Sequence, residues 1–194
     1  MSTIAMGHAG AEAAPAEKKG LWSWITTVDH KRIGILYGVT AFLFFLLGGL
    51  EALLIRWQLG APDKTFLSPE QYNQLFTMHG TTMIFLGVMP LSAMFFNYFI
   101  PLLIGARDVA FPRLNLASWY IYVVGAVFAL VSILAGGVDT GWTFYTPYST
   151  STSGAVVWLT MGAFILGFSS IFTGLNFIVT IHKMRPAWMG WFKM

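Results

Sequence analysis

Four long apolar runs, separated by shorter polar segments, dominate the pattern of the chain. An α-helix rises about 1.5 Å per residue, so roughly 20 apolar residues cross the hydrocarbon core of a bilayer. Each run is long enough for this, and the pattern predicts an all-α membrane protein with four transmembrane helices. We expect these helices at about residues 33–57, 70–103, 116–136 and 155–182.

Helix-capping and helix-breaking residues indicate where the second helix begins and where it bends. Ser68 is a suitable N-cap, and Pro69 occupies the first helical position, where its missing N–H costs nothing. Pro90 lies inside the run and removes one backbone donor, so we expect a kink near residues 86–88.

The N-terminal segment differs from the rest of the chain. Residues 1–20 are rich in Ala, Gly and Glu and lack the apolar core of a signal peptide, so we expect a disordered cytoplasmic tail. Residues 21–32 carry Trp22 and Trp24 and are predicted to form an interfacial segment, because tryptophan favours the membrane surface. Residues 33–194 form the predicted transmembrane region.

Composition favours a bilayer as the solvent. Hydrophobic residues make up 56% of the chain, charged residues only 10%, and the mean hydropathy is +0.67. Soluble domains carry about 25% charged residues. Cysteine is absent, which excludes disulfides and thiolate metal sites.

Lysine and arginine gather on one predicted side of the membrane, which by the positive-inside rule places both termini in the cytoplasm. The residues on that side are Lys18, Lys19, Lys31, Arg32, Arg107, Arg113, Lys183, Arg185 and Lys193, and those on the other side are Arg56 and Lys64.

His79 is the most informative polar residue, because a polar ring in hydrocarbon is costly and usually functional. It could ligate haem iron, with Gly80 leaving room beside it, or it could form an interhelical hydrogen bond. A single histidine completes no metal site. His30 and His182 are expected at the inner interface, so a second ligand has to come from another chain or from further sequence.

Two charged residues lie in the outer part of the first predicted helix, and one of them, Arg56, is expected near the membrane level of His79. Arg56 ends the first helix and either snorkels to the interface or donates to the polar edge of a cofactor. Glu51 lies more than a turn deeper, where an acid pairs, stays protonated or carries protons.

Asp108 lies in the inner loop and is either a loop acid paired with a neighbouring arginine or a proton entrance. Small polar side chains could extend a water file inward from it, or could simply pack helices together. These residues are Asn97, Asn115, Asn176, Ser118, Ser169 and Ser170.

The chain from Val28 onward resembles subunit I of the haem-copper oxidases, the catalytic subunit of cytochrome c oxidases. The blocks that carry the resemblance are DHKRIGILY, LLIR, the H-x₃-MIF-x₃-MP block from His79 to Pro90, P-x-x-IGARDVAFPRLN, GWTFY and SSIFTGLNFIVTI. The resemblance implies the N-terminal part of a twelve-helix fold. It implies that this chain is a truncated piece, a proteolytic product or one product of a split subunit.

The resemblance also implies roles for individual residues. His79 would be an axial ligand of the low-spin haem, a haem a, and Arg56 would contact its formyl group. Tyr72, Trp142 and Tyr145 would lie near its propionates. Asp108 would be the entrance of a proton pathway that includes Asn97, Asn115, Asn176, Ser118, Ser169 and Ser170. The high-spin haem and copper would belong to later helices.

Several positions depart from the family pattern. Leu116 replaces the second of two adjacent asparagines, and the stretch from Pro90 to Asn97 is one residue shorter than in mitochondrial-type enzymes. Gln58 replaces a glutamate that helps to bind calcium or sodium in some members. Leu47 and Gln71 stand where ubiquinol oxidases carry an arginine and a histidine, which favours cytochrome c as the electron donor.

The implied function is that of a terminal respiratory oxidase that reduces O₂ to water and pumps protons. The implied partners are the remainder of subunit I, subunits II and III, cytochrome c and the bilayer of a bacterial cytoplasmic membrane, with no nucleic acid. Three alternatives stay open: a quinol-oxidising member of the family, a non-catalytic membrane assembly subunit, and a b-type cytochrome. The last would need paired histidines at one depth, which the sequence lacks.

Overall fold

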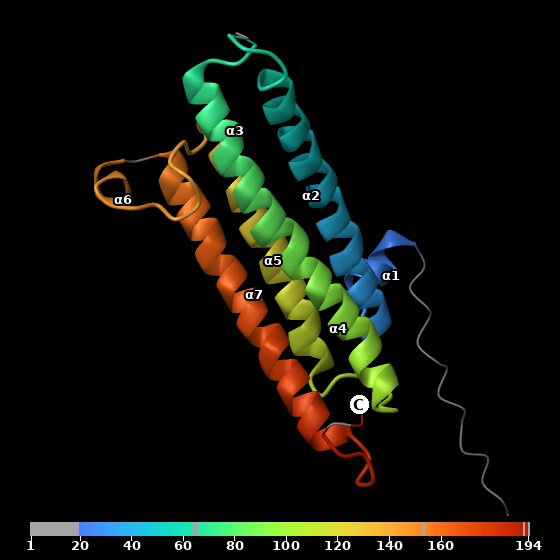
Figure 1. Ribbon diagram of the computed structural model, residues 1–194. Coiled ribbons are helices and arrows are strands. Elements are labelled where there is room, and N and C mark those ends of the chain that lie inside the picture. Colours follow the sequence, from blue (N-terminus) through green and yellow to red (C-terminus); the bar gives the residue numbers. More distant parts are fainter. Residues whose placement is uncertain (1–19, 64–65, 153, 192, 194) are drawn as a thin grey trace, which may run out of the picture.

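The computed structural model describes residues 20–63, 66–152, 154–191 and 193, and these residues form a bundle of four long helical rods (Figure 1). The predicted tail up to Lys19, together with Lys64 of the charge pattern, lies outside the described residues. The four rods are α2 (His30–Gln58), the continuous helix α3–η1–α4 (Pro69–Thr81, Thr82–Val88 and Met89–Leu103), α5 (Pro112–Leu134) and α7 (Ala155–Met184). All four are long and apolar enough to cross a membrane, and no strand occurs among the described residues, which confirms the predicted fold class.

The helix ends follow local capping chemistry. Ser68 accepts a hydrogen bond from the backbone N–H of Gln71 at 3.2 Å, and Gln71 accepts one from the N–H of Ser68 at 3.0 Å, so the predicted cap is confirmed as a capping box. Asp29 caps α2 by accepting from the N–H of Lys31 at 2.7 Å. The helix therefore begins at His30, three residues before the predicted start, and takes in part of the expected interfacial segment.

Two short helices lie outside the rods: α1 (Leu21–Ile25) in the expected interfacial segment, and α6 (Tyr148–Ser151) in the loop before α7. The third rod also starts earlier than predicted, at Pro112, because a proline at the first helical position starts the helix at no hydrogen-bonding cost. Since the rods alternate in direction, the His30 end of α2 and the Met184 end of α7 lie at the same end of the bundle (Figure 1).

The second rod changes its hydrogen-bond pattern just before Pro90. The sequence predicts a kink near residues 86–88, and the structure has a π-helical segment, η1, over Thr82–Val88. The N–H of Met89 donates to the carbonyl of Ile84, five residues back. π-helical turns of this kind occur frequently at functional sites.

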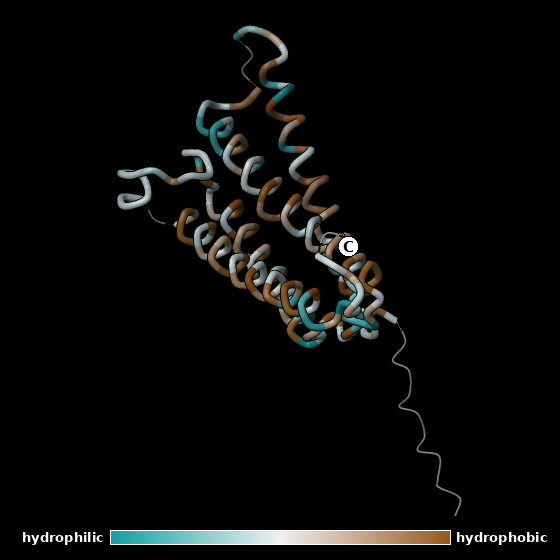
Figure 2. Tube along the Cα trace, turned by 60° about the horizontal axis from the view of Figure 1, so that its bottom comes forward, coloured by the Kyte–Doolittle hydropathy of each residue, from teal (hydrophilic) through white to brown (hydrophobic). Residues whose placement is uncertain are grey.

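The rods pack as two pairs, with α2 along α3–η1–α4 and α5 along α7. Apolar residues cover the rods and polar residues collect at their ends and in the loops (Figure 2). Many large side chains face outward, among them Phe42, Leu53 and Phe164, each more than half exposed. The interior combines small and polar residues, which are usual where helices associate in lipid, with larger side chains such as Ile33 and Trp119.

Gly125 of α5 and Gly162 of α7 mark the closest approach within one pair. A Cβ atom on Gly162 would lie 2.9 Å from the carbonyl oxygen of Gly125 and 3.2 Å from the backbone N of Ala129. Both neighbours are backbone atoms, which cannot move aside as a flexible side chain can.

Replacing Gly162 with Ala should therefore force α5 and α7 apart and lower the free energy of unfolding by about 1–3 kcal/mol, the usual cost of overpacking. Thermal denaturation in detergent, followed by circular dichroism, measures the change. Gly167→Ala is the matched control on the same helix, because a Cβ there meets nothing within 4 Å. Equal melting temperatures for the two variants would contradict this packing.

Candidate functional site

His79 lies in the last turn of α3 and is held by the backbone of α2. Its Nδ1 atom is 2.9 Å from the carbonyl oxygen of Gly48. A carbonyl oxygen only accepts hydrogen bonds, so Nδ1 carries the proton and donates it. In the neutral ring Nε2 then keeps its lone pair, which is the tautomer that a metal-ligating histidine requires.

The close fit between α2 and the start of η1 depends on Gly48. A Cβ atom there would lie 2.7 Å from Sδ and 2.9 Å from Cγ of Met83. A larger residue there would have to displace the Met83 side chain, which fills the space between the two helices beside the bond from His79 to the Gly48 carbonyl.

The loop after α5, at the end of the bundle that the charge pattern predicts to be outer, is attached to the helix that carries His79. The N–H of Gly141 donates to the hydroxyl oxygen of Thr77 at 2.8 Å. A Cβ on Gly80 would have Cδ1 of Trp142 3.9 Å away, and Trp142 packs edge-on against Phe85 with ring centroids 6.1 Å apart. The structure therefore brings Trp142 beside the turn of His79.

The other predicted haem-contacting residues lie further along the outer end. Tyr72 is two turns before His79 on α3 and is half-buried. Arg56 is exposed in the last turn of α2, about 12 Å along the helix from Gly48 at 1.5 Å per residue. Tyr145 is 77% exposed in the outer loop.

The described residues contain no group of three or more His, Cys, Asp or Glu side chains that could hold a metal ion. His79 nevertheless fits haem iron as one axial ligand, because its Nε2 is left as a lone-pair donor and its ring orientation is fixed from α2.

Asp108 lies at the inner end, in the turn between α4 and α5. It is half-buried, and its Oδ1 accepts the N–H of Val109 at 2.7 Å. Burial raises the pKa of Asp108, and the nearby Asp29 raises it further, whereas the hydrogen bond from Val109 and the charge and backbone N–H of His30 lower it. The net effect is a raised pKa. A carboxyl whose pKa lies closer to neutral pH is better suited to exchange protons.

His30, expected at the inner interface, is only 2% exposed. Its Nδ1 donates to the backbone carbonyl of Asn97 at 2.8 Å and so joins α2 to α4. This burial was not predicted from the sequence, because the charged residues Lys31 and Arg32 follow His30 directly.

The three predicted asparagines are fully buried but differ in their partners. Asn176 pairs with both backbone groups of Phe111, accepting at 2.9 Å and donating at 3.1 Å, and so fixes the loop that carries Asp108. Asn115 has no partner for either amide atom, and Asn97 has none for Oδ1, among the residues that the structure describes. Buried amides in this state usually hold internal water.

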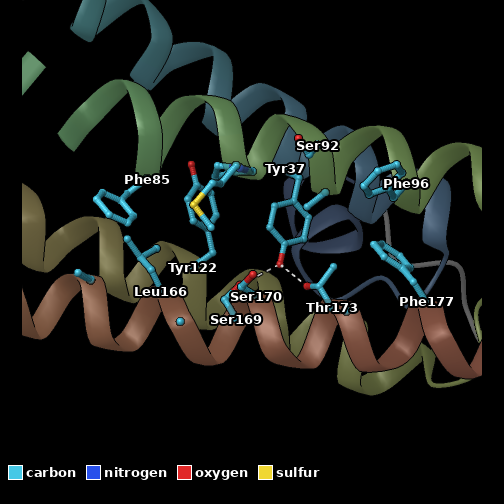
Figure 3. A pocket seen from close by; sticks show the side chains of 16 residues that line it. Tyr37, Phe85, Ser92, Phe96, Tyr122, Leu166, Ser169, Ser170, Thr173 and Phe177 are labelled. Carbon is cyan, nitrogen blue, oxygen red and sulfur yellow. Dashed lines mark hydrogen bonds between the residues drawn. The ribbon is translucent and has the colours of Figure 1, made fainter. Parts of the chain in front are cut away.

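A chain of hydroxyl groups continues from Asn115 toward the middle of the bundle. The Ser118 hydroxyl donates to the Asn115 carbonyl at 2.7 Å, and the Tyr37 hydroxyl donates to Ser118 Oγ at 2.9 Å. Tyr37 also lies 3.2 Å from Ser169 Oγ and 3.5 Å from Thr173 Oγ1, as the dashed lines in Figure 3 show.

This hydroxyl chain borders a cavity of about 380 Å³ between η1–α4 and α7. Ser170, although exposed, lines the cavity together with Tyr37, Ser169 and Thr173 (Figure 3). The sequence reading missed Tyr37 and Thr173. A phenol inside an apolar run was the available signal for Tyr37, since a buried tyrosine hydroxyl usually finds a partner.

The predicted residues thus form two separate groups that share α2. Gly48, at the outer group, and Tyr37, at the inner group, are 11 residues apart, or about 16 Å along the helix.

Comparison with known proteins shows the family of the chain. The sequence model of the family described as "Cytochrome C and Quinol oxidase polypeptide I" matches residues 32–194. Proteins named "Cytochrome c oxidase subunit 1" are similar to the chain. The one from Bacillus subtilis (strain 168) is 45% identical over 176 residues, which are 90% of this chain and 28% of that protein.

Two further relatives with the same name agree. The protein from Bacillus sp. (strain PS3) is 47% identical over 186 residues, covering 92% of this chain and 30% of its own length. The one from Thermostichus vulcanus is 46% identical over 177 residues, covering 88% of this chain and 32% of its own length. The chain therefore spans less than a third of the length of these relatives. With four apolar helices and a match over most of its length, the chain belongs to the cytochrome c and quinol oxidase polypeptide I family.

Proposed function

We propose that this chain is part of the catalytic subunit of a terminal respiratory oxidase that reduces O₂ to water with electrons from cytochrome c and pumps protons. The observation that carries the proposal is the bond from His79 Nδ1 to the Gly48 carbonyl, which leaves Nε2 as a metal-binding lone pair inside a membrane helix. The relatives' name, cytochrome c oxidase subunit 1, supports cytochrome c as the source of the electrons.

In this proposal His79 is an axial ligand of a low-spin haem a, which when bound supplies one-electron transfer. Gly48 fixes the imidazole and raises its basicity as a ligand, because a ligating histidine that donates its other N–H binds a metal more strongly. Trp142 beside Gly80 closes the outer side, with Arg56, Tyr72 and Tyr145 toward the polar edge of the haem. The high-spin haem and copper belong to the remainder of the subunit.

Protons enter, in this proposal, at Asp108 and pass inward through water held by Asn97 and Asn115. The hydroxyl chain of Ser118, Tyr37 and Ser169 continues the path to the cavity lined by Ser170. Asn176 holds the entrance loop in place rather than carrying protons, since both its amide atoms are occupied by Phe111. Moving one charge against a membrane potential of 100 mV costs about 2.3 kcal/mol. The residues proposed to line the path beyond Asp108 are uncharged, so they add no fixed charge that would hold a proton back.

The partners in this proposal are the remainder of subunit I, subunits II and III, cytochrome c and the lipid of a bacterial cytoplasmic membrane, with both termini cytoplasmic. A quinol-oxidising enzyme is the second candidate, because the description of the matching family includes quinol oxidases. Leu47 and Gln71 favour cytochrome c over quinol. An assay of the complete enzyme with each donor separates the two.

Replacing His79 with Ala should abolish the absorption bands of the low-spin haem in the assembled oxidase, because the iron loses an axial ligand. The optical difference spectrum of the purified complex is the measurement. His182→Ala is the control, since His182 is exposed at the inner end and bonds only within its own helix, to the Ile178 carbonyl at 2.8 Å. An unchanged spectrum in the His79 variant would sink the ligand role and favour a non-catalytic assembly subunit.

Replacing Asp108 with Asn should lower the rate of proton uptake from the inner side by about tenfold or more, because an amide has no exchangeable acidic proton. In the unchanged protein the carboxyl is protonated below its raised pKa and charged above it, and the variant should lose this pH dependence. Proton uptake by the oxidase in vesicles is the measurement, with Asp139→Asn in the outer loop as control. Normal uptake in the Asp108 variant would rule out the entrance role.

A further inference from the structure

Pro90 leaves the carbonyl of Leu86 without its α-helical donor. In an α-helix the N–H of residue 90 would donate to the carbonyl of residue 86, and proline has no N–H. Leu86 is only 3% exposed, in the middle of a membrane helix where water is scarce. A carbonyl in that position, next to a turn whose hydrogen bonds have shifted to the π-helical register, can accept from a donor on another helix.

Tyr122 of α5 supplies this donor. Its hydroxyl donates to the Leu86 carbonyl at 2.9 Å, and the side chain is only 2% exposed. Figure 3 shows the ring extending from α5 toward the ribbon of η1 and α4. The phenol therefore occupies the hydrogen-bonding place of the absent Pro90 N–H and joins two rods that otherwise belong to different helix pairs.

Tyr122 bonds to η1, the segment that directly follows the turn of His79 in the second rod. η1 begins at Thr82, three residues after His79, and its N-terminal turn lies against Gly48. A Cβ on Gly48 would meet Met83 Sδ at 2.7 Å and Thr82 Cγ2 at 3.6 Å. A displacement of η1 would therefore change the distance between the Gly48 carbonyl and the imidazole that donates to it.

Tyr122 also contacts the hydroxyl chain. Its ring stacks on that of Tyr37, with centroids 5.5 Å apart and an angle of 25° between the planes. Both rings line the cavity of about 380 Å³. The side chain thus lies between the helix of the proposed haem ligand and the proposed proton path.

We propose that Tyr122 is a positioning residue for His79: its hydroxyl takes the place of the missing Pro90 N–H and holds the π-helical turn against Gly48. The inference rests on the proposed role of His79 as a haem ligand. Tyr122 touches neither substrate nor cofactor in this role and acts only through the Leu86 carbonyl.

Tyr122→Phe in the complete oxidase removes only the hydroxyl and keeps the stacked ring. We expect the amides of residues 82–90 to exchange with deuterium about tenfold faster, the change expected for the loss of one net hydrogen bond. We also expect a displaced absorption maximum of the low-spin haem, while the carbon monoxide spectrum of the high-spin haem is unchanged. Tyr120→Phe is the matched control, because Tyr120 on the same helix donates to the Ile25 carbonyl at a distant point.

A second substitution makes the test independent of folding defects. Pro90→Ala introduces an N–H that can donate to the Leu86 carbonyl, so the double variant Pro90→Ala/Tyr122→Phe should regain slow exchange and the original absorption maximum. The same logic applies if Tyr122→Phe fails to assemble: restored assembly in the double variant supports the proposal, and continued failure overturns it.

The outcomes separate this inference from the proposed function. Unchanged exchange in Tyr122→Phe, or faster exchange with an unmoved low-spin band, overturns the positioning role and leaves His79 as the ligand. A low-spin spectrum that survives His79→Ala overturns the ligand role itself.

Discussion

In the hydrocarbon core of a bilayer no water is at hand to pair with a backbone N–H or C=O group, so the chain must supply every partner itself. Helical rods meet this demand except where a residue lacks an N–H, as Pro90 and Pro101 do in the second rod. Near Pro90 the Tyr122 hydroxyl donates to the Leu86 carbonyl from another helix. The same demand explains why serine and threonine hydroxyls in the rods bond to backbone carbonyls, as Ser132 does to Ala155 at 2.7 Å.

Helix α2 is long enough to reach from one face of a membrane to the other and contacts both polar groups of the bundle. His30 near its start and Gly48 further along are 18 residues apart, or about 27 Å of helix, close to the roughly 30 Å of the hydrocarbon core. At the first position an imidazole donates to the backbone of α4, and at the second the backbone accepts from His79 on α3. A single helix thus orients both the outer histidine and the inner polar group around Asn97.

The interior combines small and polar residues with a few large side chains such as Tyr37 and Tyr122, whereas many large apolar residues face outward. Glycines at positions 125 and 162 let α5 and α7 approach until backbone meets backbone. Between the two helix pairs the packing opens into a cavity bordered by Tyr37. Among the described residues, Oδ1 of Asn97 and both amide atoms of Asn115 have no hydrogen-bond partner. Internal water and mobile protons need this combination of rigid rods and incompletely filled polar space.

The sequence by itself determined the four rods, the capping box at Ser68 and the family, because apolar length, capping and motif order are local properties of the chain. It did not reveal the burial of His30, the hydroxyl chain through Tyr37 or the bond from Tyr122 to Leu86. Those depend on which faces of different helices meet. Nothing in an apolar run specifies whether a tyrosine faces lipid or another helix, so only the packed bundle decided the partner of each polar side chain.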